Sequence, residues 1–375
     1  MANYDHPYVP QQNPMYTPYP QVGMDPFYEQ RREEKHRLGK TASGLSWMLL
    51  LVVLLMAALP SVETSFLRMI GYRWQGELQF SGYTPLLYYL VNGVTYLLAF
   101  ALPPLLYMAV KRLPLQQVLP FQKTRFSTAL ACVFLGMGVC MLANFPANWM
   151  MDFLEWAGYN GTVPDSPLTG EPSIQALYVI SLAVIPALVE ELVFRGAVLH
   201  GLRRFGDGFA IVGSAFLFGM FHGNLVQLPF AFFCGLALAF VVVKTGNLWV
   251  SVAIHFLNNG LSAAITLLQW YQGDVLANAV YLIAFSAWVL LGIASVVFLA
   301  LRRKRFFDLH RPNSLLTAGQ KHRRGLCQWA WASGALWWGR LATTIPAPVR
   351  QLRHNPAPGT PCWLPEARGK PQNQA

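Results

Sequence analysis

The chain has 375 residues, of which 54% are hydrophobic and only 12% are charged. Soluble domains carry about 25% charged residues, so this composition excludes an ordinary soluble enzyme and predicts a membrane protein with several spans. The formal net charge of +11 lies in the tail. Residues 1–301 hold 15 basic and 15 acidic side chains, whereas residues 302–375 hold 13 basic and 2 acidic side chains. This distribution favours a lipid bilayer and no nucleic acid as the partner.

Three regions follow one another along the chain. Residues 1–43 are rich in Tyr, Pro, Gln and Asn and end in a basic cluster, which predicts a disordered cytosolic N-terminus. Residues 44–301 contain eight apolar runs, at 44–60, 85–110, 126–147, 174–201, 208–226, 227–243, 248–268 and 275–301. A spanning helix needs ~20 residues, so we expect an all-α bundle of about eight transmembrane helices. Residues 302–375 are basic and contain Trp and Pro, and we expect a disordered cytosolic tail.

Basic residues alternate between the loops of this predicted bundle. They cluster before the first run and after the second, fourth, sixth and eighth runs, whereas the 144–173 loop has none. Cytosolic loops are enriched in Lys and Arg. The alternation predicts eight spans with both termini in the cytosol.

Two adjacent glutamates, Glu190 and Glu191, interrupt the fourth run. An ionisable side chain at membrane depth costs at least ~2.5–3.5 kcal/mol, and each carboxyl disfavours the charge of its neighbour. A functional role is therefore the first hypothesis. Glu191 and Arg195 are four residues apart and are predicted to pair on one helix face, whereas Glu190 lies about 100° around the helix and can face a cavity.

Further polar residues interrupt two later runs. His222 closes the fifth run, and His255 and Asn259 share a face of the seventh run because they are four residues apart. This set suits hydrolysis: a buried carboxylate can take a proton from water, and His and Asn can donate hydrogen bonds to a developing oxyanion, at ~2.7–4 kcal/mol per donor. Glu190, His222 and His255 could alternatively hold one metal ion, since zinc accepts imidazole nitrogen and carboxylate oxygen.

The three motifs, Glu-Glu-x-x-x-Arg, Phe-x-x-x-His and His-x-x-x-Asn, resemble those of the CPBP family of intramembrane proteases in order and spacing. That family is also called the CAAX protease and bacteriocin-processing, or Abi, family, and it includes the type II CAAX prenyl endopeptidases. The resemblance covers about residues 174–268. The Phe-His-Gly-Asn-Leu-Val-Gln run is similar to bacterial members, which implies a bacterial plasma membrane.

The resemblance implies an intramembrane endopeptidase that cleaves a membrane-associated peptide or lipidated protein, either prenylated and CAAX-like or of the bacteriocin type. Glu190 would activate water, and His222 would share that water or bind a metal. His255 and Asn259 would stabilise the oxyanion or complete a metal site. The implied cofactor is one divalent metal such as zinc, with a metal-free glutamate mechanism as the alternative.

The resemblance gives Glu191 and Arg195 a supporting role. Two other functions fit the same residues: a proton-coupled transporter that uses Glu190 and His255 as a relay, and a non-catalytic immunity or scaffold member of the family. Hydrolysis needs Glu190 and His222 to meet, although Glu190 is expected near the cytosolic end of its run and His222 ~20 Å from the cytosolic start of its own. We expect Phe205–Gly213 to lie partly in the cytosol, which would reduce this separation.

Overall fold

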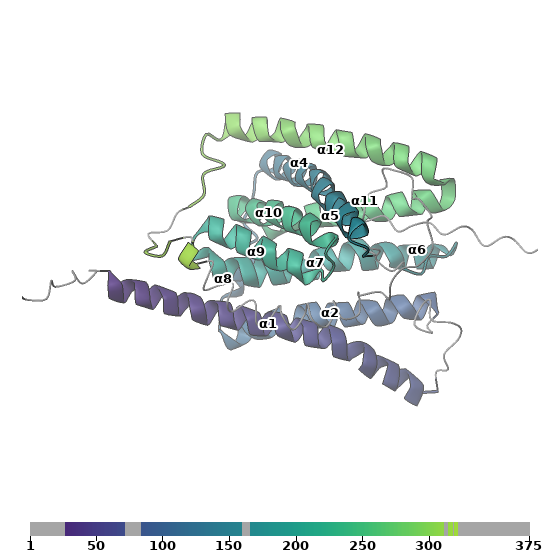
Figure 1. The fold of residues 1–375 in the computed structure, drawn as a ribbon, viewed down its shortest axis with the longest axis horizontal. Coiled ribbons are helices and arrows are strands. Elements are labelled where there is room, and N and C mark those ends of the chain that lie inside the picture. The colour runs from purple at the N-terminus through teal and green to yellow at the C-terminus, as the bar shows by residue number, and fades with distance from the viewer. Residues whose placement is uncertain (1–26, 72–83, 160–165, 311–313, 318, 322–375) are drawn as a thin grey trace, which may run out of the picture.

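The computed structural model describes residues 27–71, 84–159, 166–310, 314–317 and 319–321. These residues form helices and no strand, so the predicted all-α fold is confirmed. Seven helical stretches among them are long and apolar enough to cross a membrane, and most helices run along the long axis of the molecule (Figure 1). The chain is a multi-pass membrane protein.

The apolar runs of the sequence correspond to observed helices. The first half of the chain contains α1 (Tyr28–Met69), α2 (Pro85–Val110), α3 (Leu115–Val118), α4 (Phe126–Leu142) and α5 (Asn144–Trp156). The second half contains α6 (Pro172–Val179), α7 (Ile185–Glu191), α8 (Leu199–Arg203), α9 (Asp207–Phe221), α10 (Gln227–Thr245), α11 (Leu248–Gln272) and α12 (Asp274–Arg302). Helix α9 has 15 residues and is ~22 Å long at 1.5 Å per residue. It is therefore the one predicted run of the eight that falls short of membrane length.

The stretch from α6 to α8 occupies an inner layer of the bundle. It lies between α2 on one side and α10 and α11 on the other, whereas α12 forms the outermost layer beyond α4 (Figure 1). Helix α7 contacts both α2 and α11. Polar residues on α7 consequently face protein on two sides.

Helices α4 and α12 approach each other closely where two glycines meet. A Cβ atom added to Gly138 would lie 3.1 Å from the Cα of Gly292 and 3.2 Å from the carbonyl oxygen of Trp288. Small residues let membrane helices approach to backbone contact. This contact holds the outermost helix against the bundle.

The structure corrects the prediction for residues 1–43. Helix α1 begins at Tyr28, so residues 28–43 are helical, and residues 1–26 lie outside the described residues. Leu38, Ala42 and Leu45 are fully buried, at the three- and four-residue spacing of one helix face. Packing against the bundle extends the helix upstream of the apolar run.

The beginning of the basic tail also differs from the disorder that we expected for 302–375. In its described part, Leu316 is buried and Lys321 Nζ donates a hydrogen bond of 2.7 Å to the carbonyl oxygen of Phe205. The tail therefore starts by packing on the end of the bundle. The Trp-containing segment further on lies outside the described residues.

Candidate active site

The two glutamates lie on a short α-helical stretch between two π-helical segments. Segment η2 (Ile180–Val184) precedes α7, and segment η3 (Leu192–Val198) follows it, within the continuous helix Pro172–Arg203. Single π-helical turns inside α-helices are frequent at functional sites. Glu190 and Glu191 are 7% and 0% exposed, so both carboxylates depend on protein partners.

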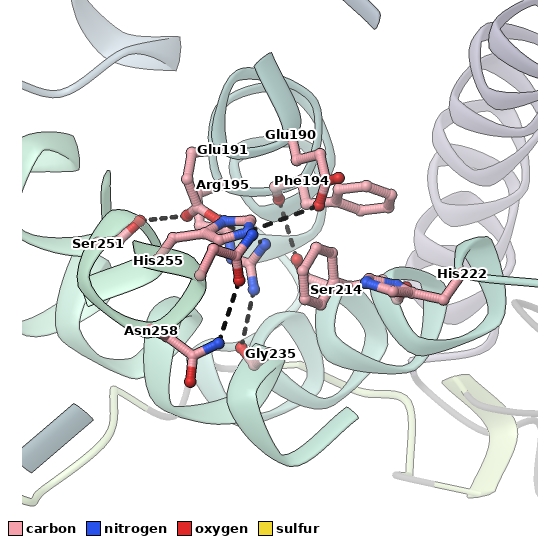
Figure 2. Close-up of polar contacts among 12 residues, drawn as sticks. Glu190, Glu191, Phe194, Arg195, Ser214, His222, Gly235, Ser251, His255 and Asn258 are labelled. Atoms are coloured by element: carbon pink, nitrogen blue, oxygen red, sulfur yellow. Dashed lines mark hydrogen bonds and ion pairs between the residues drawn. The ribbon is translucent and has the colours of Figure 1, made fainter. Parts of the chain in front are cut away.

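Glu191 is held by one cation and by two hydrogen-bond donors. Its Oε1 lies 2.9 Å from Arg195 Nη1 and 3.0 Å from His255 Nδ1, and the Ser251 hydroxyl donates to its Oε2. The predicted ion pair of Glu191 and Arg195 is thus present, with both side chains fully buried. Figure 2 shows Ser251 and His255 reaching Glu191 from the same helix, α11.

The Phe218 ring connects the three motifs. The guanidinium carbon of Arg195 lies 4.2 Å from its centre, a cation–π geometry. The rings of His222 and His255 lie 4.8 Å and 5.9 Å from the same ring, both edge-on. Phe218 therefore sets the orientation of both imidazoles around the buried cation.

Glu190 has one bonded and one unbonded carboxylate oxygen. The Tyr96 hydroxyl donates to Oε1. Oε2 is buried without a hydrogen-bond partner among the described residues and lies 3.9 Å from His255 Nε2, too far for a direct hydrogen bond. In the tautomer in which His255 Nδ1 donates to Glu191, Nε2 carries a lone pair. Two acceptors at this separation can share one bridging water that donates to both.

These groups open into a pocket of about 370 Å³, its open mouth included. The four residues predicted as catalytic all line it: Glu190, His222, His255 and Asn259. Apolar side chains and two thiols form much of the remaining wall: Cys140, Phe218, Phe230, Ala231, Cys234 and Leu238. The pocket therefore combines a small polar cluster with an apolar lining, as ligand sites usually do.

The helix lengths explain why His222 reaches this pocket. Glu190 lies 13 residues before Arg203 at the end of α8, and His222 lies 15 residues after Asp207 at the start of α9. The two helices are joined by a short turn, so at 1.5 Å per residue both residues lie ~20 Å from it. Glu190 and His222 therefore lie at about the same distance from the turn that joins their helices. The partly cytosolic position of Phe205–Gly213 stays a prediction.

His222 and His255 occupy different places relative to Glu190. His222 Nδ1 donates a hydrogen bond of 2.9 Å to the carbonyl oxygen of Phe218, which fixes the ring on its own helix. The imidazole that faces the unbonded oxygen of Glu190 is that of His255 (Figure 2). The resemblance implied that His222 shares the water with Glu190 or binds a metal. This geometry instead favours His255 as the residue that shares the water.

The predicted metal ligands do not form a metal site in this arrangement. Within the described ranges, no group of three or more His, Cys, Asp or Glu side chains is placed to hold one ion. Zinc bound by protein residues requires three or four ligands at about 2.0–2.3 Å. We therefore derive no chemical step through a metal.

Asn259 binds the helix next to Pro186. Proline has no N–H, so the carbonyl of Leu182, four residues earlier, lacks its α-helical donor. The Asn259 amide donates a hydrogen bond of 3.0 Å to that carbonyl oxygen. In η3, the Ser214 hydroxyl similarly donates a hydrogen bond of 2.9 Å to the carbonyl oxygen of Phe194. Side chains of α9 and α11 thus donate hydrogen bonds to backbone carbonyls of the helix on both sides of Glu190.

We expect the Asn259 contact to depend on the proline. Asn259→Ala should lower the free energy of unfolding by about 1–3 kcal/mol, the cost of an unpaired buried carbonyl. In a Pro186→Ala background, which restores the backbone donor, the same change should cost less than half as much. Denaturant unfolding in detergent micelles measures both values. Asn258→Ala is the control, because its contact is with Asn259 Oδ1, and an equal cost of Asn259→Ala in both backgrounds would refute the dependence.

Two partners of the glutamates were missed from the sequence. Ser251 was detectable, since it lies four residues before His255 on the same face of α11 and extends the His-x-x-x-Asn spacing by one step. Tyr96 gave no signal, because it lies in α2, 94 residues before its partner Glu190. Only the packing of α2 against α7 brings it to the site.

Residues 172–261 match the family model described as type II CAAX prenyl endopeptidase Rce1-like. The match includes all three motifs and confirms the resemblance over these residues. Comparison with curated protein sequences and with solved structures gives no match.

Proposed function

We propose that this chain, whose residues 172–261 match the model of a type II CAAX prenyl endopeptidase Rce1-like family, hydrolyses a peptide bond of a membrane-associated substrate with water activated by Glu190. One observation supports this most strongly. Glu190, which lines the pocket, has a buried carboxylate oxygen, Oε2, without a hydrogen-bond partner in the described part of the chain, 3.9 Å from His255 Nε2. A buried unpaired acceptor is costly to maintain, and a water held there has a base beside it.

The proposed reaction begins with that water. It donates one hydrogen bond to Glu190 Oε2 and one to His255 Nε2, which directs an oxygen lone pair toward the substrate carbonyl. As the oxygen attacks the carbonyl carbon, Glu190 takes the proton as general base. Glu190 then donates this proton to the amine nitrogen as the peptide bond breaks, so the carboxylate is regenerated.

The remaining pocket residues supply hydrogen bonds to the substrate. One N–H of the Asn259 amide is used by Leu182, and we assign the second to the developing oxyanion, where such a donor contributes ~2.7–4 kcal/mol. The His222 ring is fixed by the hydrogen bond of its Nδ1 to the carbonyl oxygen of Phe218. We assign to it a hydrogen bond to the substrate peptide on the other side of the pocket. Glu191 and Arg195 orient His255 from behind.

The substrate follows from the family and from the pocket wall. The matched family is named for prenylated CAAX peptides, and the wall includes Phe218, Phe230 and Leu238, which suit an apolar segment held in the bilayer. We therefore propose a lipidated C-terminal peptide, cleaved while its lipid remains in the membrane. The basic residues after α12 would keep the chain at an anionic leaflet.

A cleavage assay with purified full-length protein in liposomes tests this proposal. The substrates are a farnesylated CAAX-type peptide with a fluorophore and quencher, and the same peptide without the farnesyl group. We expect faster cleavage of the farnesylated peptide and no loss of rate with the chelator 1,10-phenanthroline. If the chelator lowers the rate and added zinc restores it, the metal-free mechanism is wrong. If neither peptide is cleaved, the proposed function is rejected.

A further inference from the structure

Glu190 has a hydrogen-bond partner outside the matched stretch 172–261. The Tyr96 hydroxyl, on α2, donates a hydrogen bond to Oε1. Oε2 is left facing His255 Nε2. The two oxygens of one carboxylate therefore have separate environments, one bonded to α2 and one buried beside His255.

The Tyr96 ring is itself fixed by aromatic contacts. It stacks on Phe100, one turn further along α2, with ring centres 4.4 Å apart and an interplanar angle of 15°. Phe100 packs edge-on against Phe221 at 5.5 Å, and Phe221 packs against Phe194 at 5.6 Å. Offset stacked and edge-on pairs are the favoured aromatic geometries, so these rings join α2 to η3 and α9 around the glutamate.

We propose that Tyr96 is a positioning residue for the general base. This inference rests on the proposed function and adds a residue to it. A hydroxyl that donates to a carboxylate makes a strong, directional hydrogen bond. Bonded through Oε1, the Glu190 carboxylate cannot rotate freely, and Oε2 stays directed at the water site beside His255. A base held in a productive orientation raises the rate of the chemical step without contributing to substrate binding.

The first test compares two tyrosines of α2. Tyr96→Phe removes the hydroxyl and keeps the ring that stacks on Phe100, and we expect kcat to fall about ten- to hundredfold, the range for a hydrogen bond to a charged group, with KM changed less than twofold. Tyr89→Phe is the matched control. Tyr89 is buried on the same helix, and its hydroxyl donates a hydrogen bond of 2.6 Å to the carbonyl oxygen of Pro167. Removal of this hydroxyl should leave kcat within twofold.

A double-mutant cycle separates positioning from a general structural effect. If Tyr96 acts through Glu190, Tyr96→Phe should not lower the residual rate of Glu190→Gln any further, whereas independent effects would multiply. The unfolding midpoints of a second cycle, with Glu190→Ala to remove the acceptor of the Tyr96 hydroxyl, give a measurement that needs no activity, and we expect the two changes to be non-additive there. Tyr89→Phe should be additive with Glu190→Gln.

The outcomes distinguish this inference from the proposed function. If Glu190→Gln abolishes cleavage but Tyr96→Phe behaves like Tyr89→Phe in rate and in both cycles, the role of Tyr96 is rejected and the function stands. If Glu190→Gln keeps full cleavage, the proposed function itself fails. A larger loss of kcat for Tyr96→Phe than for Tyr89→Phe, together with non-additive cycles, supports both the role of Tyr96 and the proposed function.

Discussion

Replacing Glu190 with glutamine is expected to lower kcat by about 10²- to 10⁴-fold, the usual contribution of a general base. Glutamine has the shape of glutamate, and its amide oxygen can still accept the hydrogen bond that Tyr96 donates. It cannot take a proton from water. KM should change little, because the carboxylate acts on the water and the substrate pocket keeps its shape. Steady-state cleavage of the farnesylated peptide measures both constants.

Glu63→Gln provides the matched control for this change. Glu63 lies on α1 and accepts a hydrogen bond of 2.6 Å from the Thr95 hydroxyl, so it is also a carboxylate with one hydroxyl donor within the bundle. It does not line the pocket. Its replacement should leave kcat within twofold. A Glu190→Gln protein that stays within a few-fold of wild type, or a Glu63→Gln protein that loses the same activity, would count against Glu190 as the base.

Replacing Arg195 with methionine is expected to have the largest effect on stability. The Arg195 and Glu191 side chains are 0% exposed, so the change leaves a buried carboxylate without its cation. Removing one partner of a buried ion pair costs about 3–5 kcal/mol, whereas replacing both partners with uncharged groups is often close to neutral. Denaturant unfolding in micelles should therefore show a large loss for Arg195→Met and recovery of most of it in the double variant with Glu191→Gln.

The exposed pair on α1 is the control for that measurement. Arg37 and Glu33 have the same four-residue spacing, with side chains 69% and 68% exposed and 3.2 Å apart. Exposed pairs of this kind contribute about 0.3–0.5 kcal/mol. Arg37→Met should have an effect within that range. Equal losses for Arg37→Met and Arg195→Met would mean that burial does not set the strength of the Glu191 pair.

The positions of the helices were predictable because membrane length and apolar composition are local properties of the sequence. The Glu191–Arg195 pair was predictable for the same reason, since four-residue spacing fixes the helix face. The equal distance of Glu190 and His222 from the turn between α8 and α9 was not, because the start and end of that turn decide which residues lie opposite each other. Residues 28–43 were misassigned since their helix depends on packing of α1 against other helices, which composition does not reveal.

The site shows the same division between local and distant information. Ser251, His255 and Asn259 follow one spacing on α11, and the sequence contained all three. The contact of Asn259 with Leu182 depends on a proline on another helix, and the contact of Tyr96 with Glu190 depends on how α2 packs against α7. Neither contact leaves a pattern in a single sequence, so the orientation of the base could only come from the structure.

The most direct test of peptide hydrolysis by this chain is product analysis in oxygen-18 water. Full-length protein in liposomes is incubated with the farnesylated peptide, and the products are identified by mass spectrometry. We predict two fragments from wild type, with one oxygen-18 atom in the new C-terminal carboxylate, and release of these fragments at least about 10²-fold slower from Glu190→Gln. An intact peptide that has crossed the liposome membrane would indicate a transporter, and an intact peptide that remains bound would indicate a scaffold; either result would contradict the account.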